Sequence, residues 1–219
     1  MRRPVKVLKK AARPRVYSVN EIFFSLQGEG ARAGTPNVFV RFAGCNMRCD
    51  LEAGSRSPGG FACDTEFESG HPMTAAQIVA AARKLAPKGG VGVIFTGGEP
   101  ALQLHKTLVA ALRKARFGPM CIETNGTLDV SPLELDWVSL SPKVAEHAVR
   151  VKTCSEIRYV RGLGQGIPRP SAKAGRKFIS PAFSGESLDA DTLRWCVALV
   201  KANPEWALSV QQHKTWGIR

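Results

Sequence analysis

The sequence predicts an α/β protein on a parallel sheet that forms an incomplete barrel, with about six core strands and fewer helices than strands. Three observations support this fold class. Several strand-length runs, such as VGVIFTGG, are continuously apolar, which is typical of strands buried on both faces of a parallel sheet. Strand-like and helix-like segments alternate along the first half of the chain. Some later connections between predicted strands are too short to contain full helices, so the barrel should have no helix at these connections.

The individual elements follow from local signals. Thr74 is the expected N-cap of the first helix, and Pro100 lies where the second would begin. Acidic residues near the start of the third helix and Lys201 near its end complement its dipole. The predicted strands are 38–42, 91–96, 120–124, 137–140, 157–160, 177–179 and 208–211. The predicted helices are 74–85, 102–116 and 188–202, and the predicted irregular loops are 50–62 and 161–175.

Length and composition favour one globular domain, which we place at residues 17–219. The 219 residues are 44% hydrophobic and 22% charged, which excludes a disordered chain. No apolar run approaches the ~18 residues of a membrane span, and the N-terminus lacks the apolar stretch of a secretory signal. We therefore expect a cytoplasmic protein without a membrane partner.

The formal net charge is +13, and about half of it lies near the N-terminus. Residues 1–15 hold seven Lys and Arg and no acid, so we expect residues 1–16 to form a basic flexible tail. Such a tail is either a solvated terminus or a segment that attracts polyanions weakly. The excess of +6 on the rest of the chain suits an anionic substrate as well as nucleic acid, and we expect no specific nucleic acid partner.

Three of the six cysteines crowd into a nineteen-residue stretch, which indicates a metal site. Structural zinc usually takes four ligands, and no fourth Cys or His is close to these three. Three cysteines suit an iron–sulfur cluster whose fourth iron is left open, with zinc or no metal as the alternatives. The crowded cysteines are Cys45, Cys49 and Cys63. The scattered ones, Cys121, Cys154 and Cys196, are expected to be buried, inert thiols.

A second motif, Thr96-Gly97-Gly98-Glu99-Pro100, follows the most apolar predicted strand. Glycines at a strand end let backbone groups approach a ligand closely, and ligands collect at the carboxyl ends of parallel strands. Glu99 would accept hydrogen bonds from an ammonium group. The alternative is a tight turn into a helix with no ligand.

The two motifs together resemble the radical S-adenosylmethionine superfamily, whose fold is an incomplete (β/α) barrel. The first gap of its usual C-x3-C-x2-C pattern is present, but the second is thirteen residues long, which enlarges the cluster loop at 50–62. The resemblance implies that Cys45, Cys49 and Cys63 hold a 4Fe-4S cluster. It further implies that S-adenosylmethionine contacts Ala62, Asp64, Gly98, Glu99, Ser141, Pro142 and Lys143.

Further motifs narrow the resemblance. FSLQGEG at 24–30, FVRFAGC at 39–45 and LSVQQHK at 208–214 look like the 7-carboxy-7-deazaguanine synthase family of queuosine biosynthesis. The implied activity is that of a carbon–nitrogen lyase. It contracts the ring of 6-carboxy-5,6,7,8-tetrahydropterin to 7-carboxy-7-deazaguanine and releases ammonia. The implied partners are a second copy of the chain and a flavodoxin-type electron donor.

The resemblance also assigns residues to the substrate and to Mg²⁺. Thr65 would be the protein ligand of Mg²⁺, and Arg219 would act through a terminal carboxylate. The implied substrate-binding residues are Leu26, Gln27, Gly28, Glu29, Arg41, Thr96 and Arg219. Independently of the family, an arginine inside an apolar strand end needs an anion, and Arg41 would pair with the substrate carboxylate or else with Glu21 or Glu29.

Two other classes of protein remain as alternatives to a radical lyase. A radical activase of another protein would leave SLQGEG and Arg41 without a role. A zinc-containing basic protein that binds nucleic acid would account for the charge and the cysteines, but not for TGGEP or SPK at 141–143.

Overall fold

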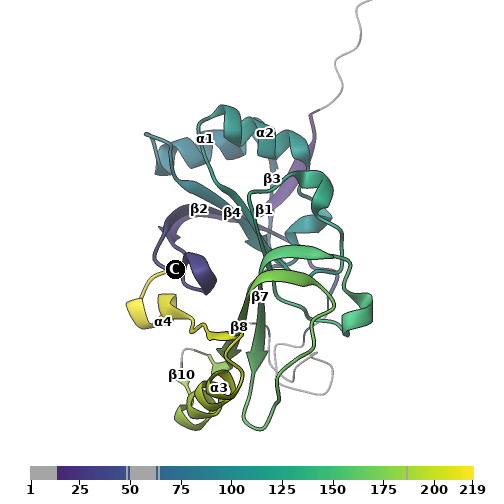
Figure 1. Ribbon diagram of the computed structural model, residues 1–219. Helices are drawn as coiled ribbons and strands as arrows, with labels where there is room; N and C mark the ends of the chain where they lie inside the picture. The colour runs from purple at the N-terminus through teal and green to yellow at the C-terminus, as the bar shows by residue number, and fades with distance from the viewer. Residues whose placement is uncertain (1–13, 48, 50–62, 64, 186) are drawn as a thin grey trace, which may run out of the picture.

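The computed structural model describes residues 14–47, 49, 63, 65–185 and 187–219. Its main feature is a curved sheet whose strand order is β11-β8-β7-β6-β5-β4-β2-β1-β3 (Figure 1). All neighbours from β11 to β2 are parallel, whereas β1 is antiparallel to both β2 and β3. These strands are β1 (Val16–Leu26), β2 (Pro36–Phe42), β3 (His71–Thr74), β4 (Gly92–Gly97), β5 (Met120–Thr124), β6 (Trp137–Leu140), β7 (Thr153–Arg161), β8 (Lys173–Pro181) and β11 (Ala207–Leu208).

Few helices accompany the sheet. Between β4 and β8, α2 is the one α-helix among the described residues; the other connections hold single 3₁₀ turns or a loop. The α-helices are α1 (Ala75–Leu85), α2 (Lys106–Lys114), α3 (Ala190–Ala202) and α4 (Gln212–Trp216). The short elements are η1 (Gly30–Arg32), η2 (Pro100–Leu102), η3 (Ser131–Leu133), η4 (Glu146–Ala148), β9 (Phe183–Ser184) and β10 (Ser187–Leu188).

The fold class is confirmed, with corrections to several elements. The strands expected at 120–124 and 137–140 have those bounds, and α1 begins after the predicted cap Thr74, whose side chain accepts from Gln77 N. The helix expected at 102–116 is shorter, because η2 and a turn occupy its first residues. The strand expected at 208–211 ends at Leu208, and β1 and β3 were not predicted. Residues 1–13 of the expected tail and the whole of loop 50–62 lie outside the described residues, and Val16 already belongs to β1.

Side-chain alternation gives the sheet two chemically different faces. Successive side chains of a strand point to opposite faces. On β2, Val38, Val40 and Phe42 pack in one hydrophobic core with Ile78 of α1 and Leu108 of α2. We call the face away from α1 and α2 the inner face. It carries the alternate residues, which include Phe39 and Arg41 of β2, Thr96 of β4, Glu123 of β5, and Glu156 and Arg158 of β7.

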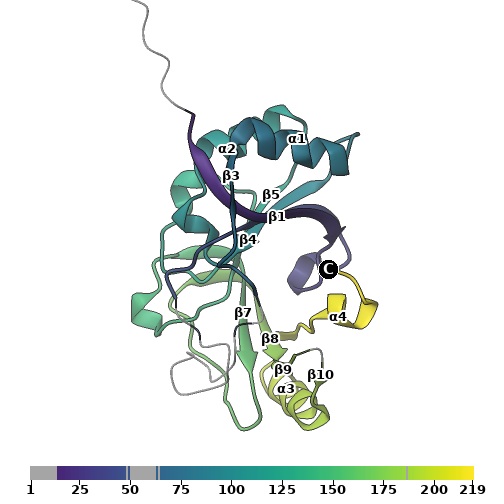
Figure 2. The ribbon, with the colours of Figure 1, turned by 180° about the vertical axis from the view of Figure 1, so that it is seen from behind.

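The sheet does not close into a barrel, and two chain segments meet at its opening. The loop after β1 and the first residue of η1 contact the segment after β11 through two hydrogen bonds. Gly30 N donates to Ser209 Oγ at 2.8 Å, and Gln212 N donates to Gly28 O at 3.0 Å. Figure 2 shows α4 and the end of the chain beside η1, across from β7 and β8. Residues 27–30 and 209–219 therefore border the inner face. No helix among the described residues is long and apolar enough to cross a membrane.

Candidate active site

The first cysteine of the triad lies directly against the glycine motif. Gly44 and Cys45 follow β2, and Gly98 and Glu99 follow the neighbouring strand β4. Glu99 N donates to Gly44 O at 3.0 Å, and Gly98 N donates to Phe42 O at 3.2 Å. A Cβ atom on Gly98 would overlap the Gly44 carbonyl and approach Cys45 Cβ at 2.9 Å. Only glycine fits here, so the two sequence motifs form one continuous site.

All three triad cysteines are partly exposed, and none of them is joined in a disulfide within the described part of the chain. Burial raises the pKa of the Cys45 thiol, and the charges of Glu99 and Cys63 act on it in the same direction. Within the described ranges, no three His, Cys, Asp or Glu side chains are placed to hold a single metal ion. The electrostatic effect of Cys63 on Cys45 indicates that these two thiols lie near one another. Three cysteines suit an iron–sulfur cluster, in which each cysteine binds a different iron.

Glu99 is fully buried, and its carboxylate holds the end of β5 in place. It accepts hydrogen bonds from Ala101 N and Thr124 Oγ1, both at 2.9 Å, and from Asn125 N at 2.7 Å. Burial raises the pKa of this carboxyl group, against the effect of these donors. Donors of the chain itself thus occupy three of the about four acceptor positions of this carboxylate.

The loop after Cys45 is tied to the end of the next strand. Asn46 Nδ2 donates to Thr127 Oγ1 at 2.8 Å, and Asn125 Nδ2 donates to Asn46 Oδ1 at 3.0 Å. Ser141, which begins the SPK motif, donates its N–H to Thr124 O at 2.8 Å, and Lys143 Nζ lies 3.0 Å from Ser141 Oγ. The predicted residues Ser141, Pro142 and Lys143 therefore share the carboxyl edge with the cysteine and glycine motifs.

Two of the residues assigned to S-adenosylmethionine cannot be placed. Ala62 and Asp64 lie outside the described residues. Thr65, assigned to Mg²⁺, is described, and its carbonyl oxygen lies 3.7 Å from Cys63 Sγ.

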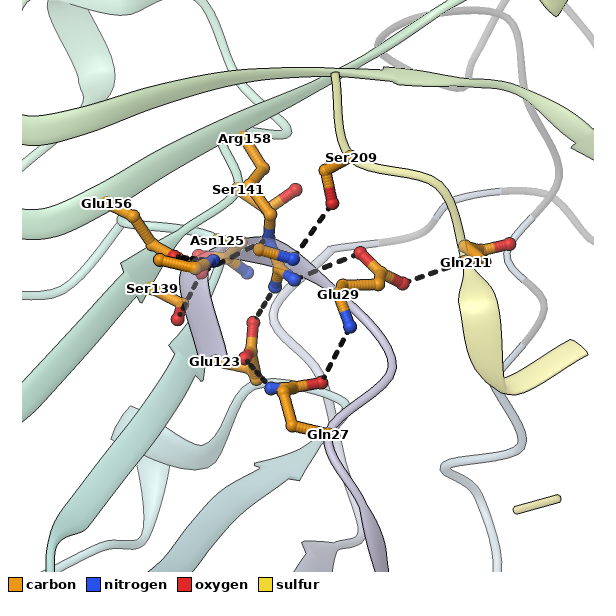
Figure 3. Close-up of polar contacts among 12 residues, drawn as sticks. Gln27, Glu29, Glu123, Asn125, Ser139, Ser141, Glu156, Arg158, Ser209 and Gln211 are labelled. Carbon is orange, nitrogen blue, oxygen red and sulfur yellow. Dashed lines mark hydrogen bonds and ion pairs between the residues drawn. The ribbon is translucent and has the colours of Figure 1, made fainter. Parts of the chain in front are cut away.

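Three carboxylates surround one arginine on the inner face, and we call this group the carboxylate cluster (Figure 3). Arg158 is 7% exposed and pairs with Glu123, with Glu29 at 3.0 Å and with Glu156 at 3.7 Å. Glu156 also accepts from Ser139 Oγ at 2.9 Å and from Ala31 N at 2.8 Å. The cluster thus links β5, β6 and β7 to the loop before η1.

The carboxylate cluster contains three carboxyl groups and one guanidinium, and this excess of acidic groups favours the protonated form of a buried carboxyl group. Burial raises the pKa of Glu123 to about 7, with Arg158 opposing the shift and Glu29 and Glu156 adding to it. Near neutral pH, Glu123 is therefore more protonated than an ordinary glutamate. Such a cluster is suited to a ligand edge that carries several N–H donors.

The QGEG loop presents its polar groups to this cluster. Gln27 Nε2 donates to Glu123 Oε1 at 2.9 Å, and Gln211 Nε2 donates to Glu29 Oε1 at 3.0 Å. Both glycines are packed closely: a Cβ on Gly28 would overlap His213, and one on Gly30, which has φ +67°, would overlap Glu156. The loop conformation therefore depends on glycine at both positions. Leu26, also predicted to contact substrate, ends β1 and is partly exposed.

Arg41 is paired with Glu21, one of the two glutamates that the sequence offered as partners in place of the substrate carboxylate. Arg41 Nε donates to Glu21 Oε1 at 2.9 Å, and Arg219 Nη2 binds the other oxygen of Glu21 at 2.6 Å. The register places Arg41 beside Thr96 on the neighbouring strand. The structure thus brings three predicted substrate residues, Arg41, Thr96 and Arg219, to one part of the inner face.

Several polar residues of the site were not predicted from the sequence. Glu123 stands alone in the apolar strand MCIET, and Glu156 and Arg158 alternate with apolar residues in SEIRYV. Charged residues at alternate positions of a buried strand are a signal of a polar inner face. The residues missed are Glu123, Ser139, Glu156, Arg158, Ser209 and Gln211, whereas Glu21 was named as the alternative partner of Arg41.

Comparison with known proteins agrees with this geometry. The Radical SAM superfamily model matches residues 39–159, which include the triad and the glycine motif. The 7-carboxy-7-deazaguanine synthases of Caulobacter vibrioides and Burkholderia multivorans are each 38% identical to this chain, over 92% of its length and 99% of theirs. The crystal structure of QueE from Escherichia coli matches with a TM-score of 0.65 and 25% identity, over 90% of this chain and 95% of that one.

The sheet, the cysteine triad and the glycine motif define a radical S-adenosylmethionine protein, and the chain belongs to the Radical SAM superfamily. That superfamily implies a 4Fe-4S cluster and S-adenosylmethionine as cofactors. Within it, the chain belongs to the 7-carboxy-7-deazaguanine synthase family, a family of lyases. This membership favours the radical lyase over the protein activase and the nucleic-acid-binding protein.

Proposed function

We propose that this chain converts 6-carboxy-5,6,7,8-tetrahydropterin to 7-carboxy-7-deazaguanine by a radical ring contraction that releases ammonia, as a step of queuosine or other 7-deazapurine biosynthesis. Its relatives carry the name of this activity. The observation that carries the proposal is the chemistry of the inner face. It combines a group of carboxylates and amides at one place with a pair of guanidiniums at another.

The carboxylate cluster would bind the pyrimidine edge of the pterin. That edge offers an exocyclic amine and ring N–H groups, which donate, next to a carbonyl oxygen, which accepts. Glu29 and Glu123 supply acceptors, and Gln27 supplies both an acceptor and a donor. Arg158 fixes the two carboxylates from behind, so their orientation does not depend on the ligand.

Arg41 would bind the substrate carboxylate. Glu21 occupies its Nε, and no other partner contacts its two terminal nitrogens in the part of the chain that the structure describes. These nitrogens are the pair that forms a bidentate fork with a carboxylate. Thr96, beside Arg41 in register, would contribute its hydroxyl at the same end of the ligand.

The carboxyl edge of the sheet would hold the cofactors. Cys45, Cys49 and Cys63 would bind the cluster, while Gly98, Glu99, Ser141, Pro142, Lys143, Ala62 and Asp64 would bind S-adenosylmethionine. When bound, the reduced cluster and S-adenosylmethionine would supply the one-electron chemistry needed for hydrogen abstraction at carbon six of the pterin. The chain's own part is to hold that carbon at the carboxyl edge and to keep water away.

The proposal also includes a divalent cation and partners of the chain. Thr65 would be a ligand of Mg²⁺, a hard cation that takes oxygen ligands, because it lies beside Cys63 near the carboxyl edge. We further propose a homodimer, a flavodoxin-type electron donor and a cytoplasmic location. These three proposals follow from the family rather than from contacts in this structure.

Anaerobic incubation tests the function directly. Reconstituted protein is mixed with a reductant, S-adenosylmethionine and the carboxylated pterin, and deazaguanine carboxylate and ammonia are measured. We expect both products in equal amounts. Cleavage of S-adenosylmethionine without either product would overturn the proposed substrate while leaving the superfamily chemistry intact.

A further inference from the structure

The part of the inner face where Arg41 would bind the substrate carboxylate contains a second arginine, Arg219. Glu21 accepts from Arg41 through one carboxylate oxygen and from Arg219 through the other. Both guanidinium carbons also lie over the ring of Phe23, Arg41 at 5.6 Å and Arg219 at 5.3 Å from its centroid. One carboxylate and one aromatic ring therefore hold the two cations as a pair.

Arg219 reaches this position because the end of the chain is fixed along β1. Ser25 Oγ donates to Arg219 O at 2.6 Å, and the preceding helix α4 is attached through Gln212 N to Gly28 O at 3.0 Å. The backbone of Arg219 thus lies beside Ser25, while its guanidinium lies at Glu21. The side chain follows the inner face of β1 between these two residues.

The charge of this site differs from that of the carboxylate cluster. Two guanidiniums share one side-chain carboxylate here. At the carboxylate cluster, three carboxylates share one guanidinium. A ligand with a carboxylate at one end and N–H donors at the other would be oriented by this difference.

We infer that the Arg219 guanidinium is a second anion-binding group. Together with Arg41 it binds the carboxylate of the substrate and makes the site specific for carboxylated ligands. This inference rests on the proposed function, and it gives the Arg219 side chain a role in specificity that differs from the contact through a terminal carboxylate implied by the family. Glu21 acts as the positioning residue that aims both guanidiniums. The competing explanation is that the Arg219–Glu21 pair only fastens the end of the chain, which would affect all ligands alike.

The test compares two exposed arginines. Arg219 is 71% exposed and paired with Glu21, whereas Arg194 is 70% exposed and paired with Asp191 on α3. Dissociation constants are measured anaerobically, on reconstituted protein with S-adenosylmethionine, for the carboxylated tetrahydropterin and its decarboxylated analogue. We expect Arg219→Gln to weaken the carboxylated ligand about three- to tenfold and the analogue less than twofold, as for one partly exposed charge-assisted contact. Arg194→Gln should change neither.

Equal weakening of both ligands by Arg219→Gln would show that the residue only fastens the chain end, and no weakening of either would also overturn the inference. The proposed function has its own test in Arg41→Ala. That variant should lose more affinity for the carboxylated ligand than for the decarboxylated analogue, whether or not Arg219 contributes to binding. If wild-type protein forms no product and Arg41→Ala shows no discrimination, the proposed function fails as well.

Discussion

Replacing Arg158 by methionine is the sharpest test of the inner face, because it leaves the carboxylate cluster without its cation. The guanidinium is 7% exposed and pairs with three carboxylates, of which Glu156 is 1% exposed and Glu29 and Glu123 about a fifth. Removing one partner of a buried ion pair costs about 3–5 kcal/mol. Since two of the carboxylates keep some solvent, we expect a loss near the lower end, about 3 kcal/mol at pH 8.

This loss should depend on pH in a defined direction. In wild type, the pKa of Glu123 is raised from 4.5 to about 7. The folded protein therefore binds more protons than the unfolded chain between these values, and this carboxyl group makes stability fall as pH rises through them. Without Arg158, which lowers that pKa, the fall continues to higher pH. The difference between wild type and variant should therefore be larger at pH 8 than at pH 6.

Urea unfolding under anaerobic conditions measures both effects. Arg113→Met is the matched control, because Arg113 pairs with Asp136 at 3.0 Å while both side chains are more than 40% exposed, so its loss should cost less than about 1 kcal/mol. Arg158→Lys, which keeps the charge but not the fork, should fall between the two. A loss for Arg158→Met no larger than the control, or the same loss at both pH values, would refute this account of the cluster.

Three further outcomes are expected. Cys63→Ala should abolish cluster binding while Cys121→Ala keeps it, measured as iron and sulfide per chain; equal loss would contradict the triad. Gly28→Ala should cost about 1–3 kcal/mol in urea unfolding, because its methyl group meets a packed side chain, whereas Gly166→Ala points into open space and should be neutral. In wild type, affinity for the pterin should rise as pH increases through about 7, since ionised Glu123 accepts hydrogen bonds; Glu123→Gln should remove that dependence, and an unchanged profile would exclude this role.

The sequence by itself determined the elements whose signals are local. Continuous apolar runs predicted the parallel strands, and the capping residue Thr74 predicted the start of α1. The glycine motif and the first two cysteines were also readable, because they need particular residue types at short spacing, whereas Cys63 was assigned through its neighbours Asp64 and Thr65. Strand β1 was missed, since its polar positions are explained only by an inner face that exists once β2 is paired beside it.

Tertiary structure alone decided which charges meet. Glu29, Glu123 and Glu156 are separated by long stretches of chain, and nothing local in the sequence assigns them to one arginine. The same holds for Glu99, whose carboxylate binds the end of the next strand instead of facing outward. It holds too for Arg219, which reaches Glu21 from the far end of the chain. Pairing between distant residues is set by strand order and by which face each side chain takes, and these become fixed only when the sheet assembles.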